Sequence, residues 1–459
     1  MDPTQRFDPN KTQMQAGQQT QMMAAVPSNA DPNKTSAMGA MRGLTATITP
    51  SRQATMANGP AREQFLVEFS SQGEGIPGFD GSAGQRSMLN LCLVIDRSGS
   101  MEGPPLEYAK QACSYVVDML SPTDVLSIVT FEETVDLLMP PQRVTNKQPI
   151  KDGIAKLQAG NTTDLYGGIA MAAQQLAQSE EPGRATRMIV LSDGDPTTGI
   201  KDFPSLVQHA GDIKTRGITC TFLGFGPDYN EELLAAMAKK AGGNYYYIQQ
   251  PQLIPEVFRT ELEKLMTISA RNLSLDMKVA RWVNLRAATG HTVPPGDREF
   301  TLALADLEKG SVLQQVFDFE FQNHPLGHYR VAAGKLTYDD SVSGRQEVVD
   351  LDFVMEFTAD ESRYSAPVNP LVSNAAQIAA ASRTVEKTIM GLKTGQLSAA
   401  GALAELQKTQ ALLLQDGRTA EAQEVTLAMR ALQSGDQGQA EKTLMGAVVN
   451  LDQGKKQGL

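Results

Sequence analysis

The hydrophobic pattern changes character three times along the chain. Between residues 88 and 266, short apolar runs alternate with stretches whose apolar residues repeat at helical spacing. The runs lie at 89–95, 124–131, 187–192, 218–224 and 244–248, and the helical stretches at 105–120, 147–158, 165–178, 203–216, 230–241 and 252–266. Nearly continuous apolar runs are typical of strands buried on both faces of a parallel sheet. Their alternation with helices predicts a doubly wound, Rossmann-like α/β domain over 85–268.

After residue 269 the period of the pattern drops to two. Polar and apolar residues alternate over 272–280, 281–287, 299–305, 312–321, 329–338 and 347–357, with Gly, Pro and Asp between the runs. We therefore expect an antiparallel β-sandwich over 269–360. A strand-like run at 62–70, within the segment 61–84, has no place in the α/β domain. We expect this strand to join the sandwich, so that the α/β domain is inserted between sandwich strands.

Residues 370–455 return to helical spacing. Apolar residues recur at intervals of three, four and seven, and Gly395, Gly417 and Gly435 stand where C-terminal caps are expected. The pattern predicts a bundle of about four helices. Its simplest role is structural or in oligomerisation, because it carries no carboxylate–histidine pattern typical of a cofactor site.

Composition separates the first 60 residues from the rest. The 459-residue chain is 41% hydrophobic and has a net charge of −11, which argues against a general nucleic-acid binder. Residues 1–60 hold five basic and three acidic residues, a net charge of +2, and Phe7 is their only aromatic residue. In a segment with so little apolar content, the burial of side chains cannot offset the conformational entropy lost on folding. We therefore expect a disordered tail over 1–60 that is rich in Thr, Gln and Met.

Signals for export and membrane insertion are missing from the pattern. Residues 1–30 show no basic region followed by an apolar one, and no apolar stretch approaches the roughly 20 residues of a membrane helix. Cys92, Cys113 and Cys220 are widely spaced and lie in apolar patterns, so we expect reduced, buried thiols. A cytoplasmic protein without a membrane span is the resulting expectation.

A candidate metal site follows the first apolar run. Asp96, Ser98 and Ser100 place a carboxylate and two hydroxyls on one side of a tight turn, at the strand end where open α/β sheets bind ligands. The loop at 160–168 offers a threonine, and Asp193 follows a later strand. Oxygen ligands of this kind suit a hard divalent cation. The simpler alternative for any one loop is a turn that caps a helix.

These motifs resemble the von Willebrand factor A family, whose metal-ion-dependent adhesion site is built from Asp-x-Ser-x-Ser, a later Thr and a later Asp. The resemblance covers about 88–266 and is strongest to bacterial members, and the flanking regions are similar to bacterial proteins related to inter-alpha-trypsin-inhibitor heavy chains. It implies that Ser98 and Ser100 bind the metal through hydroxyls and that Asp96 and Asp193 act mainly through water. Thr163 matches the family threonine better than Thr162, because its spacing into the next helix is retained.

The resemblance implies recognition rather than catalysis. Mg²⁺ is the expected ion, with Mn²⁺ or Ca²⁺ as substitutes, and a partner's Asp or Glu carboxylate is expected to fill its open coordination position. Two alternatives stay open. One is an accessory subunit of an ATPase-driven remodelling complex, and the other is a metal-dependent hydrolase, for which Asp164 or Asp195 would have to be the general base.

The tail contains an internal repeat. Asp-Pro-Asn-Lys-Thr occurs at 8–12 and again at 31–35, which either reflects low-complexity drift in a linker or marks a modified motif. On the second hypothesis, a Ser/Thr kinase phosphorylates Thr12 and Thr35, and a phosphothreonine-binding domain reads the product.

Overall fold

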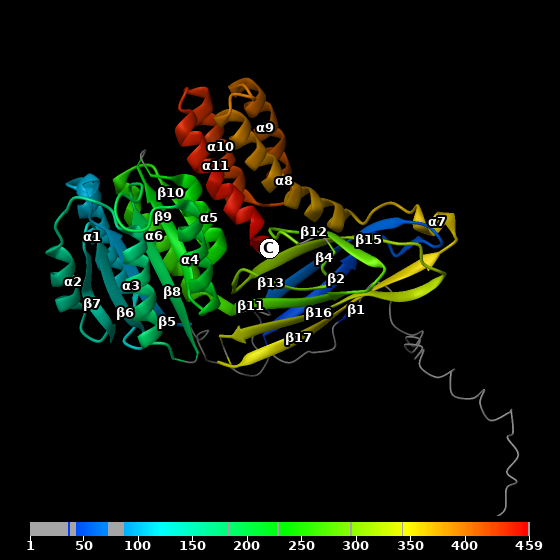
Figure 1. Cartoon of the computed structure of the whole chain (residues 1–459), viewed down its shortest axis with the longest axis horizontal. Helices are drawn as coiled ribbons and strands as arrows, with labels where there is room; N and C mark the ends of the chain where they lie inside the picture. Colours follow the sequence, from blue (N-terminus) through cyan, green and yellow to red (C-terminus); the bar gives the residue numbers. More distant parts are fainter. Residues whose placement is uncertain are drawn as a thin grey trace, which may run out of the picture.

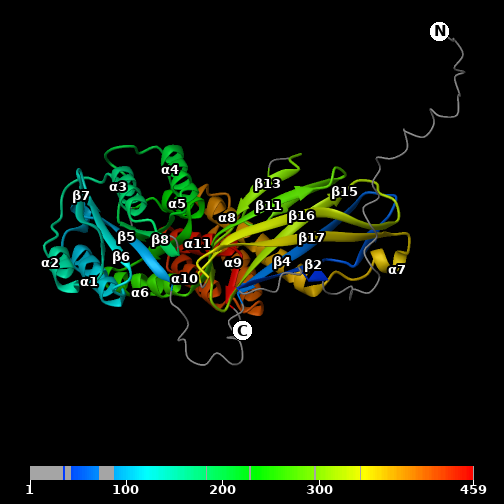
Figure 2. The same ribbon diagram turned by 90° about the horizontal axis from the view of Figure 1, so that it is seen from below.

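A computed structural model describes residues 35–36, 43–71, 87–181, 183–226, 229–293, 296–341 and 343–457 of the chain. It consists of three packed units: an α/β domain, a β-sandwich and a helical bundle (Figure 1). The α/β domain and the sandwich lie end to end, and the bundle rests on the junction between them (Figures 1 and 2). The predicted fold class is therefore confirmed.

The α/β domain is built on a sheet of six strands in the order β10-β9-β8-β5-β6-β7. All neighbours are parallel except β6 and β7, which are antiparallel. The chain adds β6 and β7 on one side of β5 and then β8, β9 and β10 on its other side. The strand order therefore reverses between β5 and β8. The strands are β5 (Met88–Asp96), β6 (Val125–Phe131), β7 (Val135–Arg143), β8 (Arg184–Ser192), β9 (Thr219–Phe225) and β10 (Gly242–Ile248).

Helices cover both faces of this sheet. Alternate residues of β5 enter different cores: Leu91 and Leu93 pack with α1, α2 and α6, whereas Cys92 and Val94 pack with α3, α4 and α5. Burial on both faces explains why the strands are almost wholly apolar. The helices are α1 (Pro104–Met119), α2 (Lys147–Ala155), α3 (Leu165–Gln178), α4 (Phe203–Thr215), α5 (Glu231–Ala241) and α6 (Ile254–Met266), with short 3₁₀ turns at η2 (Gly99–Met101) and η3 (Pro251–Leu253). Cys92, Cys113 and Cys220 are buried free thiols.

The sandwich pairs two antiparallel sheets whose inner faces form one core. One sheet has the order β1-β2-β4-β15-β12, and the other has the order β13-β11-β16-β17-β3, in which β3 alone is parallel to its neighbour. Its strands are β1 (Thr35–Ser36), β2 (Leu44–Pro50), β3 (Ala54–Met56), β4 (Ala61–Ser71), β11 (Ile268–Val279), β12 (Val283–Ala288), β13 (Glu299–Ala303), β14 (Leu307–Glu308), β15 (Ser311–Phe321), β16 (Gly327–Asp340), β17 (Gln346–Thr358) and β18 (Lys455–Gln457).

The prediction of disorder up to residue 60 is wrong for its last part. β2 pairs with β4 from Leu44 opposite Ser71 to Pro50 opposite Phe65, and β3 pairs with β17. Leu44 and Ala54 are buried in this arrangement. The segment is too polar to fold by itself, but the sandwich supplies both its strand partners and its apolar surface.

The α/β domain is inserted between two neighbouring strands of the sandwich. β4 precedes the insertion and β15 follows it, yet they are antiparallel neighbours from Ser70 opposite Val312 to Ala61 opposite Phe321. Where the chain enters and leaves the α/β domain, the buried Ser87 hydroxyl donates a 2.6 Å hydrogen bond to the Ile268 carbonyl. The two ends of the domain therefore meet at one point.

The bundle contacts both other units. It comprises α8 (Pro370–Lys393), α9 (Ala399–Gln415), α10 (Thr419–Gln433) and α11 (Gln437–Asp452). Val372, at the start of α8, packs on Leu66 and Val316 of the sandwich, whereas Val449 of α11 belongs to the core of the α/β domain. The chain then returns to the sandwich, where β18 pairs with β15. In the described part of the chain, no helix is long and apolar enough to cross a membrane.

A buried ion pair lies between the α/β domain and the sandwich. The guanidinium of Arg187, on β8, contacts the carboxylate of Asp306, and their side chains are only 2% and 6% exposed. Asp306 also accepts a 3.0 Å hydrogen bond from the Asn272 backbone N–H. Removing one partner of such a pair leaves a buried charge without compensation.

Asp306→Asn should therefore destabilise the protein strongly. We expect the free energy of unfolding to fall by about 3 kcal/mol, because Arg187 stays buried while its counter-charge is lost. Urea denaturation followed by circular dichroism measures the change, and Asp350→Asn, at an exposed position of β17, is the matched control. Identical unfolding midpoints for the two variants would contradict this role of the pair.

Candidate functional site

The predicted metal-site residues meet at the carboxyl edge of the sheet, where the strand order reverses. Asp96 is the last residue of β5, and Asp193 follows the last residue of β8, the strand beside it. Open α/β sheets bind ligands at this switch point, because the loops diverge there and leave a crevice. Asp96 is fully buried and Asp193 is 6% exposed.

The Asp96 carboxylate is held by the residues around it. One oxygen accepts a 2.9 Å hydrogen bond from the Ser98 backbone N–H, and the other accepts a 2.7 Å bond from the Ser192 hydroxyl. Ser192 was not among the predicted site residues, although it stands directly before Asp193 at the strand end. Its role depends on the distance between two strands, which a sequence pattern does not contain.

Three side chains complete a compact group of oxygens. Ser98 Oγ lies 3.1 Å from Ser100 Oγ, and Asp193 Oδ1 accepts hydrogen bonds from Ser100 at 2.8 Å and from Ser98 at 3.4 Å. Ser98 is 1% exposed, whereas Ser100 is exposed. The group therefore has one side in the protein and one side open to solvent.

Thr163 faces the same space as Ser100. A Cβ placed on Gly194 would lie 4.0 Å from both Ser100 Oγ and Thr163 Oγ1. The loop is fixed by a 2.9 Å hydrogen bond from the Thr163 N–H to Thr197 Oγ1, and the Thr197 N–H donates to the Thr163 carbonyl at 3.0 Å. Thr162 Oγ1, in contrast, is buried without a hydrogen bond to any described residue.

Glu132 ties the supporting loops together. Its carboxylate accepts hydrogen bonds from the Asn161 N–H at 3.1 Å and from the Arg97 guanidinium at 3.3 Å. Backbone N–H groups of Glu133 and Asn161 lower the pKa of Glu132 to about 2, so the carboxylate stays charged. The Gly99 N–H also donates to the Asn161 carbonyl at 3.1 Å. Glu132 was not among the predicted site residues, because no neighbouring residues in the sequence form a ligand motif.

The electrostatics of the site favour a cation. Burial, together with the negative charge of Asp193, raises the pKa of Asp96 to about 6, and the hydrogen bonds from Ser98 and Ser192 oppose this rise. Two carboxylates are thus held close together in a protected position, where a positive charge would offset their repulsion.

The oxygen geometry fits a small hard cation. Ligands 2.0–2.1 Å from an octahedral Mg²⁺ lie roughly 3 Å from each other, and the hydroxyl and carboxylate oxygens here are 2.8–3.4 Å apart. Among the described residues, no group of three His, Cys, Asp or Glu side chains could hold a metal. A metal site at this edge therefore depends on the hydroxyls of Ser98, Ser100 and Thr163.

Most of the α/β domain matches a known protein family. Residues 90–260 match the von Willebrand factor type A domain. The chain contains a von Willebrand factor type A domain. Domains of this family often mediate metal-dependent protein interactions and are typically not enzymes. The assignment of Asp96, Ser98, Ser100, Thr163 and Asp193 to the metal-ion-dependent adhesion site of this family stays a prediction.

Curated relatives resemble the chain over only part of their length. An uncharacterised protein of Synechocystis sp. is 29% identical over 58% of this chain and 65% of its own length. The uncharacterised protein YfbK of Escherichia coli is 27% identical over 41% of this chain and 33% of its own length. Human inter-alpha-trypsin inhibitor heavy chain H4 is 29% identical over 34% of this chain and 17% of its own. The chain therefore spans less than two thirds of each of these proteins.

Two solved structures share the fold well beyond the von Willebrand factor type A domain. A von Willebrand factor type A protein from Catenulispora acidiphila aligns with 85% of this chain and 91% of its own, with a TM-score of 0.67 and 16% identity. The ArnB paralog VWA2 from Sulfolobus acidocaldarius aligns with 89% of this chain and 98% of its own, with a TM-score of 0.63 and 18% identity. At these identities the likeness shows a shared fold.

The residues required by the hydrolase alternative lie differently. Asp164 caps α3, where its carboxylate accepts a 2.9 Å hydrogen bond from the Gly167 N–H, and Gly199 packs against it. Asp195 is exposed on the loop after β8. A general base must lie within hydrogen-bond reach of the proton that it abstracts. The Asp164 carboxylate is engaged in capping α3, which does not favour Asp164 as that base.

Of the two predicted phosphorylation sites, only Thr35 lies within the described residues. Thr12 lies outside the described residues, and Thr35 begins β1, opposite Ile48 of β2. Phosphorylation of the two threonines stays a prediction.

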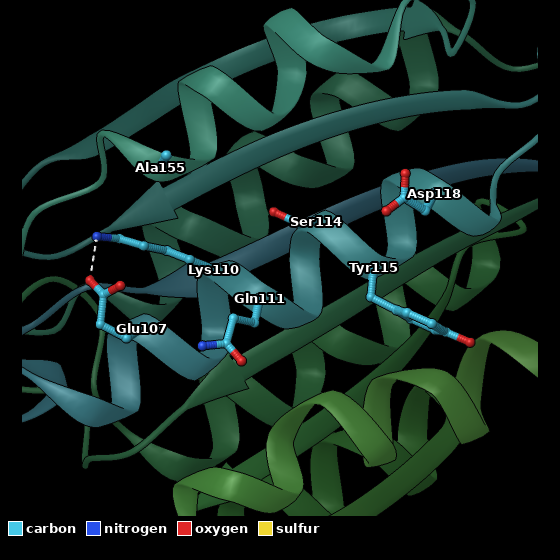
Figure 3. A pocket seen from close by; sticks show the side chains of 7 residues that line it. All are labelled: Glu107, Lys110, Gln111, Ser114, Tyr115, Asp118 and Ala155. Atoms are coloured by element: carbon cyan, nitrogen blue, oxygen red, sulfur yellow. Dashed lines mark hydrogen bonds and ion pairs between the residues drawn. The ribbon is translucent and has the colours of Figure 1, made fainter.

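A surface hollow of about 380 Å³ lies along the outer side of α1, where α2 ends at Ala155 (Figure 3). Its α1 residues run from Glu107 to Asp118, roughly 16 Å along the helix. Lys110 turns back to form a 2.8 Å ion pair with Glu107, and Tyr115 points away from both (Figure 3). These side chains do not converge on one point, and none belongs to the metal-site group.

Proposed function

We propose that this von Willebrand factor type A domain captures a protein partner through a bound divalent cation, with Mg²⁺ preferred over Mn²⁺ and Ca²⁺. Ser98, Ser100 and Thr163 would hold the ion through their hydroxyls, and Asp96 and Asp193 would act mainly through water. The observation that carries the proposal is the group of hydroxyl and carboxylate oxygens at the switch point, 2.8–3.4 Å apart and open on the side of Ser100.

The charge distribution supports binding of an acidic partner residue. The hydroxyls that would contact the ion are neutral, so the ion retains positive character toward solvent. Bound there, it supplies an open coordination position for an Asp or Glu carboxylate of the partner.

Two exposed apolar residues, Ile200 and Phe203, follow the Asp193 loop in the chain; we call them the apolar rim, and they support a protein ligand. Ile200 and Phe203 are 40% and 42% exposed, and they follow the segment that packs on the Thr163 loop through Thr197 and Gly199. Exposed apolar side chains beside a charged centre are typical of interfaces with buried anchors and a polar surround. We propose that the partner places an apolar side chain there when its carboxylate meets the ion.

Replacement of one threonine, but not its neighbour, should weaken metal binding. Thr163→Ala removes a hydroxyl that faces the oxygen group, so we expect the dissociation constant for Mg²⁺ to rise at least about tenfold. Thr162→Ala is the matched control and should bind as the wild type does. Isothermal titration calorimetry after EDTA treatment measures both, and equal effects of the two changes would contradict the assignment.

Partner capture should depend on both the ion and the site. We expect proteins retained in Mg²⁺ by the immobilised chain to be released by EDTA and to be lost with Ser98→Ala or Asp96→Ala, which remove oxygens of the proposed site. Affinity capture with mass spectrometry identifies them, and Ser114→Ala, on the outer side of α1, controls for the substitution itself. Retention that survives both EDTA and Ser98→Ala would refute the proposed function.

The apolar rim should contribute to affinity without affecting the ion. Phe203→Ala is expected to weaken capture of the identified partner about fivefold, in line with loss of roughly 1 kcal/mol from an interface aromatic. Its Mg²⁺ affinity should equal that of the wild type. Leu326→Ala, at an exposed apolar residue of the sandwich, is the control. An unchanged partner affinity in Phe203→Ala would place the interface elsewhere.

A further inference from the structure

A second cavity, whose lining includes several charged side chains, lies where the three units meet, far from the metal-site loops in the fold. It has a volume of about 70 Å³. The α/β domain contributes the ends of α4 and α5, the sandwich contributes the turn after β12 and parts of β13 and β15, and the bundle contributes the end of α11 (Figure 1). The lining residues used below are Lys214, Lys239, Lys240, His291, Gln315 and Asp452.

Positive charge dominates this lining. Three lysines face one carboxylate, and Lys239 is already paired with that carboxylate, Asp452. Within the described residues, Lys240 has no ion-pair partner. The chain as a whole has a net charge of −11, so this concentration of lysines does not follow from composition.

Lys214 is the innermost of these cations. Its ammonium donates a 3.1 Å hydrogen bond to Thr219 Oγ1, and a Cβ on Gly242 would lie only 3.2 Å from its Nζ. Burial lowers the pKa of Lys214 despite the opposing charge of Asp306, which is itself bound to Arg187. An anion in the cavity would stabilise the charged ammonium.

Gln315 provides a second and independent sign of a ligand. Its side chain is 1% exposed, and its Oε1 has no hydrogen-bond partner among the described residues. Buried polar atoms are rarely left without a partner. Because Oε1 is an acceptor, a ligand that carries a hydrogen-bond donor, such as a hydroxyl, would satisfy it.

We propose that the junction cavity binds inorganic phosphate through Lys214, Lys240 and Gln315. Inorganic phosphate near pH 7 carries both negative charge for the lysines and a P–OH group for Oε1, whereas sulfate has the same shape and charge without the hydroxyl. His291 adds a neutral ring at the wall, since burial and the nearby Lys239 lower its pKa to about 4. A phosphate held by residues of the α/β domain and the sandwich would stabilise the arrangement of these two units.

The test is equilibrium binding of phosphate to the full chain at constant ionic strength, with sulfate as the paired probe. We expect one saturable site for phosphate and at least tenfold weaker binding of sulfate. Gln315→Leu should reduce the preference for phosphate over sulfate, because it removes the acceptor. Lys214→Met and Lys240→Met should each weaken phosphate binding about tenfold, as expected for loss of a charge-assisted hydrogen bond.

Controls keep the result independent of folding and of the metal site. Lys240 is exposed, so Lys240→Met tests the cavity even where Lys214→Met alters the fold. The matched control is Lys335→Met, on the outer face of β16, which should bind phosphate as the wild type does. Ser98→Ala should do the same. The proposal is overturned if binding does not saturate, if sulfate and phosphate bind equally to the wild type, or if Lys240→Met binds like Lys335→Met. Glycerol 3-phosphate binding as tightly as phosphate would overturn the choice of the free ion.

Discussion

The antiparallel pairing of β4 with β15 is the constraint on which the rest of the structure depends. Ten residue pairs join two strands that the whole α/β domain separates in the chain. For these strands to be neighbours, the inserted domain must begin and end at the same place, and the Ser87–Ile268 hydrogen bond marks that place. The sandwich and the α/β domain are therefore coupled through their topology, and Arg187 and Asp306 add a buried ion pair at the boundary.

The same constraint orients the candidate metal site. β5 begins beside the junction and ends at Asp96, so its nine residues carry the chain roughly 26 Å away from the sandwich. The carboxyl edge of the sheet, with Ser98, Ser100 and Asp193, consequently faces outward, where a partner protein has access. The opposite edge faces the sandwich and the bundle, and the junction cavity lies there, lined by Lys214 of the α/β domain and Gln315 of the sandwich. The α/β domain thus presents one polar edge to solvent and uses the other to contact its own chain.

Local sequence patterns predicted much of this arrangement because they reflect the burial and the conformational preferences of neighbouring residues. The apolar run at 89–95 predicted a buried strand, and β5 is that strand. β7, which the sequence analysis did not predict, contains Pro140 and Pro141 and is mostly exposed at the sheet edge, so its composition differs from that of a buried strand. β2 was assigned to a disordered tail for a related reason: its apolar content is low, and its stability comes from pairing with β4.

The sequence by itself determined the fold class, the order of the three units and the residues of the candidate metal site, because periodicity and motif spacing are properties of neighbouring residues. Tertiary structure alone decided which distant groups meet. Ser192 binds Asp96 across two strands, Glu132 joins the loops of Arg97 and Asn161, and Gln315 shares a cavity with Lys214 and Lys240. Such contacts follow from chain topology and strand register, and these depend on the burial of whole sheets rather than on any short segment.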